Sequence, residues 1–209
     1  MTTLANYLTS CQRLLHDATN QFYSQSELTD YINEARLRVV RDTGCLRQLI
    51  TTTAFVQGQE AYPYASSITN GSNCIDILNI NVIWGNSKIA LDYLPWSRFN
   101  YQVRWWTLLQ GRPIVFSVYG QNTFYVGPPP DQAYATEIDA IFAPTALVNP
   151  GDVETIPIPF QSPVPYYACY QAKQRMQEWD EARWFQNMYK SQVNSANNSS
   201  YTRRLSRAL

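Results

Sequence analysis

The stretch at residues 24–47 narrows the possible folds of this 209-residue sequence more than any other segment. Ser24 precedes Glu27 by three residues, the spacing of a capping box, in which the two side chains satisfy free amides at a helix start. Apolar side chains then recur at the helical period, and Gly44 suits the left-handed conformation that ends many helices. These apolar residues are Leu28, Tyr31, Ile32, Ala35 and Val39. We therefore predict a capped amphipathic helix whose apolar face needs a partner.

Helical patterns recur near both ends of the chain. Residues 3–15 carry their apolar side chains on one helical face. Residues 166–177 and about 180–193 show the same period, with Pro165 suited to a first turn and a break expected near Trp179. One unbroken helix is the alternative for this last part. Because short connections favour antiparallel neighbours, we expect helices from both ends to pack together.

The middle of the chain shows strand patterns separated by turn residues. Two hairpins are predicted, one joining residues 75–84 to 88–93 and the other joining 114–119 to 123–126. Their turns are Gly85-Asn86-Ser87 and Gly120-Gln121-Asn122. Further strands are predicted at residues 51–56 and 134–142, and a short helix at 95–109 carries Trp96, Phe99, Val103 and Trp106 at helical spacing.

These elements predict an α+β fold in which the helical part is discontinuous in sequence. We expect both chain ends, residues 1–50 and 163–198, to form a bundle of about four helices. Residues 51–145 are expected to be an inserted antiparallel β-rich region. Residues 146–162 are rich in proline and are predicted to be an extended linker, and residues 199–209 to be a C-terminal arm.

The residue types that support most catalytic chemistry are scarce. His16 is the single histidine and the four cysteines are far apart in sequence, so we expect no metal site and no cofactor. The usual hydrolase, metalloprotease and nucleotide-binding motifs do not occur, so we do not expect an enzyme. The N-terminus has no signal-peptide pattern, and no segment approaches the ~20 apolar residues that a membrane span needs.

Low charge and many aromatic residues leave two alternative functions open. Charged residues make up 15% of the chain and aromatic residues 14%, which is typical of protein contacts but equally of an aromatic core. A carbohydrate- or receptor-binding tail module would use exposed tryptophans as stacking platforms, namely Trp84, Trp96, Trp105 and Trp106. A nucleic-acid-binding protein would use arginines among aromatic residues, namely Arg98, Arg104 and Arg112, although the zero net charge argues against it.

The charges separate along the chain. Residues 113–172 hold acids and no Lys or Arg, and the acids are Asp131, Glu137, Asp139, Asp152 and Glu154. From residue 182 onward the charged residues are all basic, and they are Arg183, Lys190, Arg203, Arg204 and Arg207. A pair of carboxylates such as Glu137 and Asp139, two apart in a strand, more often forms a solvated strand face than a catalytic pair.

Several segments in order resemble the head-to-tail adaptor proteins of short-tailed bacteriophages, also described as connector or tail tubular protein A-like proteins. The segments are YINEARLRVVRDTGCLR (31–47), FVQGQEAYPY (55–64), LPWSRFNYQVRWW (94–106), GRPIVFSVYGQNTFYVGPPPDQAY (111–134) and IPIPFQSPVPYYACYQAKQRMQEWDEARWFQNMY (156–189). The similarity covers about residues 3–195 and depends on the order of the segments, since the family has no catalytic motif.

The resemblance implies a structural virion protein at the portal vertex of the tail, assembled in the bacterial host cytoplasm. Such a protein forms a ring, typically of twelve copies, joins the portal protein to the tail nozzle protein, and lets double-stranded DNA pass without sequence-specific binding. Tail fibres are a further possible partner. The hypothetical portal-docking arm is Tyr201, Arg203, Arg204, Leu205 and Arg207. The hypothetical subunit or tail contacts are Asp131, Glu137, Asp139, Asp152 and Glu154, since a ring needs two unlike surfaces.

Overall fold

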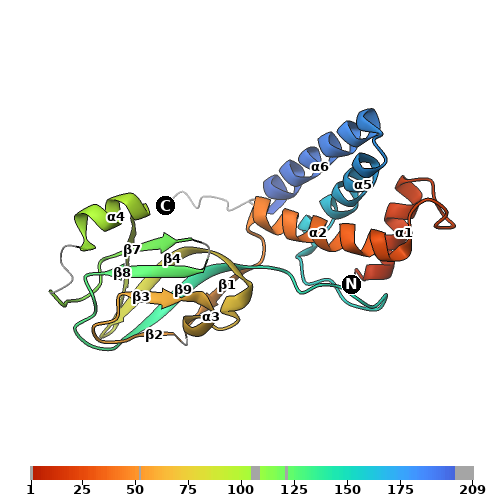
Figure 1. The fold of residues 1–209 in the computed structure, drawn as a ribbon. Coiled ribbons are helices and arrows are strands. Elements are labelled where there is room, and N and C mark those ends of the chain that lie inside the picture. Colours follow the sequence, from red (N-terminus) through yellow and green to blue (C-terminus); the bar gives the residue numbers. More distant parts are fainter. Residues whose placement is uncertain (1, 52, 105–108, 121, 201–209) are drawn as a thin grey trace, which may run out of the picture. The chain divides into compact units, whose positions relative to one another are not determined.

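The chain folds into two compact units, seen in a computed structural model that describes residues 2–51, 53–104, 109–120 and 122–200 (Figure 1). We call residues 1–46 with 144–209 the helical unit, and residues 47–143 the β unit. Helices and mainly antiparallel sheets together confirm the predicted α+β class.

The helical unit is built around α5 (Pro163–Arg175). This helix contacts α1 (Leu4–Leu14), α2 (Gln25–Thr43) and α6 (Trp179–Ser200), which come from both ends of the chain. A short 3-10 turn, η3 (Ile158–Phe160), precedes α5 and contacts α6. The buried side chains include Leu8 of α1, Ile32 of α2, Ala168 of α5 and Phe185 of α6, so each of these helices contributes to the interior.

The predicted caps of α2 are confirmed. The Ser24 hydroxyl accepts a hydrogen bond from the Glu27 amide at 3.3 Å, and the Glu27 carboxylate accepts one from the Ser24 amide at 3.2 Å. Gly44 ends the helix with φ of +63°. Leu28, Ile32, Ala35 and Val39 are buried as expected, whereas Tyr31 is only partly buried. The buried face of α2 is therefore the predicted apolar face, except that Tyr31 lies at its edge.

The end of the chain forms two helices with a break between them. Gln177 has φ of +61°, a left-handed conformation that a continuing helix does not tolerate, so the prediction of a break is confirmed and the unbroken alternative is wrong. The boundaries differ from those expected, because α5 already begins at Pro163 and α6 continues to Ser200. Val193 and Ala196 are buried, so packing stabilises a helical end that the Asn- and Ser-rich sequence disfavours.

Two sheets make up the β unit. The first has the order β1–β9–β4–β5, with β2 also paired to β9, and its strands are β1 (Arg47–Ile50), β2 (Ala54–Phe55), β4 (Cys74–Trp84), β5 (Ser87–Ala90) and β9 (Tyr134–Phe142). The second has the order β3–β8–β7–β6, and its strands are β3 (Ala61–Pro63), β6 (Asp92–Tyr93), β7 (Val115–Tyr119) and β8 (Thr123–Gly127).

Both predicted hairpins are confirmed, although the run expected at residues 88–93 divides into β5 and β6, which belong to different sheets. Trp84 pairs with Ser87 across a two-residue loop, and Tyr119 pairs with Thr123 in the second hairpin. The sequence did not predict β1, and among the described residues of the strand expected at 51–56 only Ala54–Phe55 is a strand. One strand pair departs from the antiparallel expectation, because β6 and β7 are parallel.

The two sheets share one core. Ile80 and Ile138 from the first sheet belong to the same buried cluster as Tyr62, Phe116 and Phe124 from the second. Short helical elements also belong to this unit, and those with described bounds are α3 (Tyr64–Ser67), the 3-10 turn η1 (Gly71–Asn73) and α4 (Trp96–Gln102). The predicted helix at 95–109 is therefore shorter than expected, and Trp105 and Trp106 lie outside the described residues.

Candidate functional site

The proline-rich segment at residues 146–162, expected to be a linker, contributes buried side chains to the helical unit. Leu147, Ile156 and Phe160 are all buried. The carbonyls of Pro150 and Asp152 accept hydrogen bonds from the first amides of α1, at 3.0 and 3.1 Å. Those amides have no partner inside their own helix, so the segment satisfies the start of α1.

A fully buried ion pair joins this segment to α2. The Arg36 guanidinium donates to both Glu154 carboxylate oxygens, at 2.8 Å each, and neither side chain is exposed to solvent. Arg36 also donates to the Thr145 carbonyl at 2.7 Å. Burial alone would raise the pKa of Glu154, but the hydrogen bonds from Arg36 and the Ile156 amide outweigh it and hold the pKa below its usual range. The carboxylate is therefore ionised and committed to this network.

Sequence reasoning missed Arg36, although a signal was present. Arg36 follows Ile32 by four residues and Leu28 by eight, which places it within the buried face of α2. An arginine on a buried face needs an acidic partner, because an unpaired buried charge is very costly. Glu154 is that partner, from a segment more than a hundred residues away.

Asp152, the other predicted contact residue in this segment, also bonds within the helical unit. Its carboxylate accepts hydrogen bonds from the Val148 and Asn149 amides, both at 2.7 Å. These bonds lower the pKa of Asp152 and close the turn that precedes it. Asp152 and Glu154 are therefore both used to hold residues 144–156 in place.

The predicted acids of the β unit lie at or near β9. Glu137 and Asp139 share one face of the strand, as their spacing predicts. The Lys88 ammonium binds Glu137 at 2.5 Å and lowers its pKa, while Arg47 forms a two-point contact with Asp139. Both cations are more than half exposed, with 58% and 57% of their side-chain surface accessible, and the acids beneath them are largely covered. This face therefore presents positive charge to solvent.

Asp131 is exposed and lies at the start of the turn that leads into β9. It accepts a hydrogen bond of 2.5 Å from the Tyr134 hydroxyl, which belongs to β9. Burial raises the pKa of Tyr134, and Asp131 raises it further. The five predicted acids thus fall into two groups, with Asp131, Glu137 and Asp139 in the β unit and Asp152 and Glu154 in the helical unit.

The predicted docking arm is not covered by the described residues. Tyr201, Arg203, Arg204, Leu205 and Arg207 all lie outside them.

Trp84 and Trp96, the two predicted platform tryptophans that the structure describes, both pack against neighbouring side chains. Trp96 lies 4.5 Å from the Tyr119 ring and 4.7 Å from the Tyr125 ring, with the Arg104 guanidinium 5.6 Å from its centre. Arg104 also binds Glu60 at 3.0 Å. An open stacking platform for sugars or bases needs a free ring face and free cations, so this cluster favours neither alternative function.

Trp84 has a similar environment. It stacks on Tyr134 with ring centres 5.6 Å apart, and the Arg112 guanidinium lies 5.6 Å from its centre.

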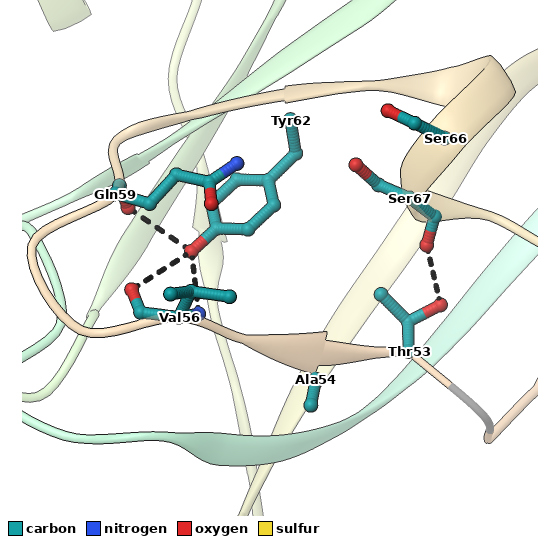
Figure 2. Close-up of a pocket in the computed structure, with 7 residues that line it drawn as sticks. All are labelled: Thr53, Ala54, Val56, Gln59, Tyr62, Ser66 and Ser67. Carbon is teal, nitrogen blue, oxygen red and sulfur yellow. Dashed lines mark hydrogen bonds between the residues drawn. The ribbon is translucent and has the colours of Figure 1, made fainter.

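A groove of about 300 Å³ opens beside β2 in the β unit (Figure 2). The Tyr62 hydroxyl accepts a hydrogen bond from the Val56 amide and donates to the Gln59 carbonyl, both at 3.0 Å. The Thr53 hydroxyl donates to the Ser67 carbonyl at 2.7 Å. These polar groups bond to one another, and among the described residues the side chains that line the groove are all uncharged.

The groups that bind metals do not gather in the described parts of the chain. No cluster of three or more His, Cys, Asp or Glu residues suited to a metal ion occurs there. His16 is exposed at the end of α1. None of the described helices combines the length and apolar character that a bilayer span requires.

Comparison with known proteins identifies the family. The family model described as SU10 adaptor protein matches residues 2–208, nearly the whole chain. No curated protein matched the sequence. The resemblance to phage adaptors that the sequence segments indicate is confirmed by this match. The chain therefore belongs to the SU10 adaptor protein family, whose members are structural components of bacteriophage virions.

Proposed function

We propose that this protein is the ring-forming adaptor between the portal and the tail nozzle of its phage, and that the genome passes through the ring. The family match over residues 2–208 carries this proposal. In this proposal α1, α2, α5 and α6 form the bundle that builds the ring, and assembly takes place in the host cytoplasm. The buried Arg36–Glu154 pair supports a rigid bundle, because it fixes residues 144–156 against α2.

The C-terminal arm and the β unit have separate roles in this proposal. The arm of Tyr201, Arg203, Arg204, Leu205 and Arg207 docks on the portal, where several arginines suit an acidic surface. The β unit, with Asp131 and the Lys88–Glu137 and Arg47–Asp139 pairs on its surface, contacts the nozzle or a neighbouring copy. Glu154 is fully buried in its own chain, so it supports the fold and is not itself a contact.

The passage of DNA requires a lumen that does not hold the phosphate backbone tightly. Many exposed cations would bind DNA strongly, since each neutralised phosphate adds affinity. The zero net charge of the chain supports weak, sequence-independent passage.

Light scattering of the purified chain, alone and mixed with the portal of its own phage, tests the proposal. A monomer or ring that adds to the portal as a defined multiple supports it. If the chain does not bind the portal at micromolar concentration, the proposal is contradicted. Replacing Arg203, Arg204 and Arg207 by Ala should weaken the association, and unchanged binding would remove the docking arm from the proposal.

A further inference from the structure

The outer face of α6 carries a stripe of exposed side chains with positive charge. Ala182, Phe185, Tyr189 and Val193 form the buried face of this helix. On the flank of that buried face, residues at helical spacing are all exposed, and they are Trp179, Arg183, Asn187, Lys190 and Asn194. Among the residues that the structure describes, neither Arg183 nor Lys190 forms an ion pair.

The outer face of α2 carries exposed side chains of the complementary sign. Asp30 and Glu34 are exposed near its start, and Arg41 is exposed on the same face in its last turn. Within the described parts of the chain these three side chains take part in no ion pair, whereas nearby Arg38 binds Asp42 at 3.0 Å. The α2 stripe lies opposite the buried face of its helix and the α6 stripe lies on the flank of its own, and no ion pair joins the two stripes among the residues described in one copy.

The spacing of the two stripes favours one alignment. Asp30 and Arg41 are separated by the same interval as Trp179 and Lys190, about 16 Å at the helical rise of 1.5 Å per residue. Antiparallel alignment places Lys190 opposite Asp30 and Trp179 opposite Arg41, with Arg183 within reach of Glu34. Parallel alignment in the same register would place Lys190 beside Arg41, where like charges repel.

The Trp179 contact adds an apolar component. Trp179 is 59% exposed in the single chain, which is unusual for so large a ring with no cover. The guanidinium of Arg41 can pack on its face, an arrangement that Arg and Trp favour. Asp180 is also exposed, and in the antiparallel alignment its carboxylate would lie near the same arginine.

We propose that the α6 stripe of one copy docks antiparallel on the α2 stripe of a second copy of this chain. Because the two surfaces differ, the contact is heterologous, and repeated rotation from copy to copy can close a ring. The inference rests on the ring proposed above and specifies the helices through which neighbouring copies meet.

Charge reversal tests this contact. The double variant Arg183→Glu/Lys190→Glu should raise the concentration needed for half-assembly at least about tenfold, since attraction becomes repulsion at two positions. Adding Asp30→Lys and Glu34→Lys to the same chain inverts both sides and should return assembly close to the wild-type concentration. Arg98→Glu, an exposed reversal on α4, is the matched control and should leave assembly unchanged. Circular dichroism checks that each variant is folded.

A second measurement uses mixed copies. Asp30→Cys in one copy and Lys190→Cys in another should form a disulfide cross-link between copies under mild oxidation, whereas Asp30→Cys with Arg98→Cys should not. If the wild type assembles and the double reversal assembles equally well, the α2–α6 contact is wrong and the ring proposal survives. If the wild type assembles neither alone nor on its portal, both proposals fail together.

Discussion

Removing one partner of the buried Arg36–Glu154 pair should destabilise the helical unit more than any other single change at a charged residue. Both side chains are fully buried and form two hydrogen bonds of 2.8 Å. Breaking such a pair leaves an uncompensated charge in the interior and costs about 3–5 kcal/mol. Domains are stable by only about 5–15 kcal/mol, so Arg36→Met or Glu154→Leu alone removes a large share.

The double variant Arg36→Met/Glu154→Leu decides whether the loss comes from the pair itself. Independent losses would add to about 6–10 kcal/mol. The double variant leaves no buried charge, and its remaining cost is the loss of partners for the Thr145 carbonyl and the Ile156 amide, about 1–3 kcal/mol each. We therefore expect a total loss of about 2–6 kcal/mol, closer to that of either single variant than to the sum of the two.

Urea unfolding followed by the helical circular-dichroism signal measures these free energies. The matched control is Arg38→Met, which breaks the exposed Arg38–Asp42 pair on the same helix and should cost only about 0.3–0.5 kcal/mol. A double variant that loses as much stability as the two single variants combined would refute the coupling. So would a single Arg36→Met variant as stable as the control.

Three further predictions concern pH and the backbone. The pKa of Glu154 is lower in the folded state than its unfolded value of about 4.3, so the ionised carboxylate stabilises the fold above that pH, and this stabilisation is lost as pH falls through the folded pKa. The difference in unfolding free energy between wild type and Glu154→Gln should therefore shrink on acidification in urea titrations. A difference that grows would contradict this. A Cβ at Gly71 would overlap the Tyr64 carbonyl, so Gly71→Ala should cost about 1–3 kcal/mol, and a wild-type melting temperature would contradict the overlap. Gln177 and Gly44 both have left-handed backbones, so Gln177→Gly should stabilise the chain and Gly44→Ala should destabilise it, each by about 1 kcal/mol. Melting temperatures that shift in the same direction for both variants would argue against that cause.

The elements that the sequence predicts well are those with local signals. The α2 helix has both caps within its own sequence, and each hairpin has a turn that fixes its register. The β1 strand has no such signal, because three of its four residues are exposed and its pairing partner lies some ninety residues away in β9. The end of α6 was underestimated for a related reason, since the packing of Val193 and Ala196 outweighs the low helix propensity of the Asn- and Ser-rich sequence.

The candidate site likewise combines features that the local sequence predicts with features that depend on distant segments. The spacing of Glu137 and Asp139 predicts that they share a strand face, but their cations come from other strands and are invisible in the local sequence. Arg36 shows that a buried face can include a charge when a distant segment supplies its partner. Composition could separate acidic from basic parts of the chain, but it could not show which acids are already paired.

The β unit begins and ends on neighbouring strands. Arg47, its first residue, pairs with Ile141 of β9, only two residues before its last residue, Ala143. The chain thus enters and leaves this unit at one place, and insertions are best tolerated where the two ends of the inserted segment lie close together. Relatives of this protein could keep the helices and vary the inserted unit, and a gene engineer could replace residues 47–143 with a short loop. Such modularity would let a phage change one set of contacts while preserving the other.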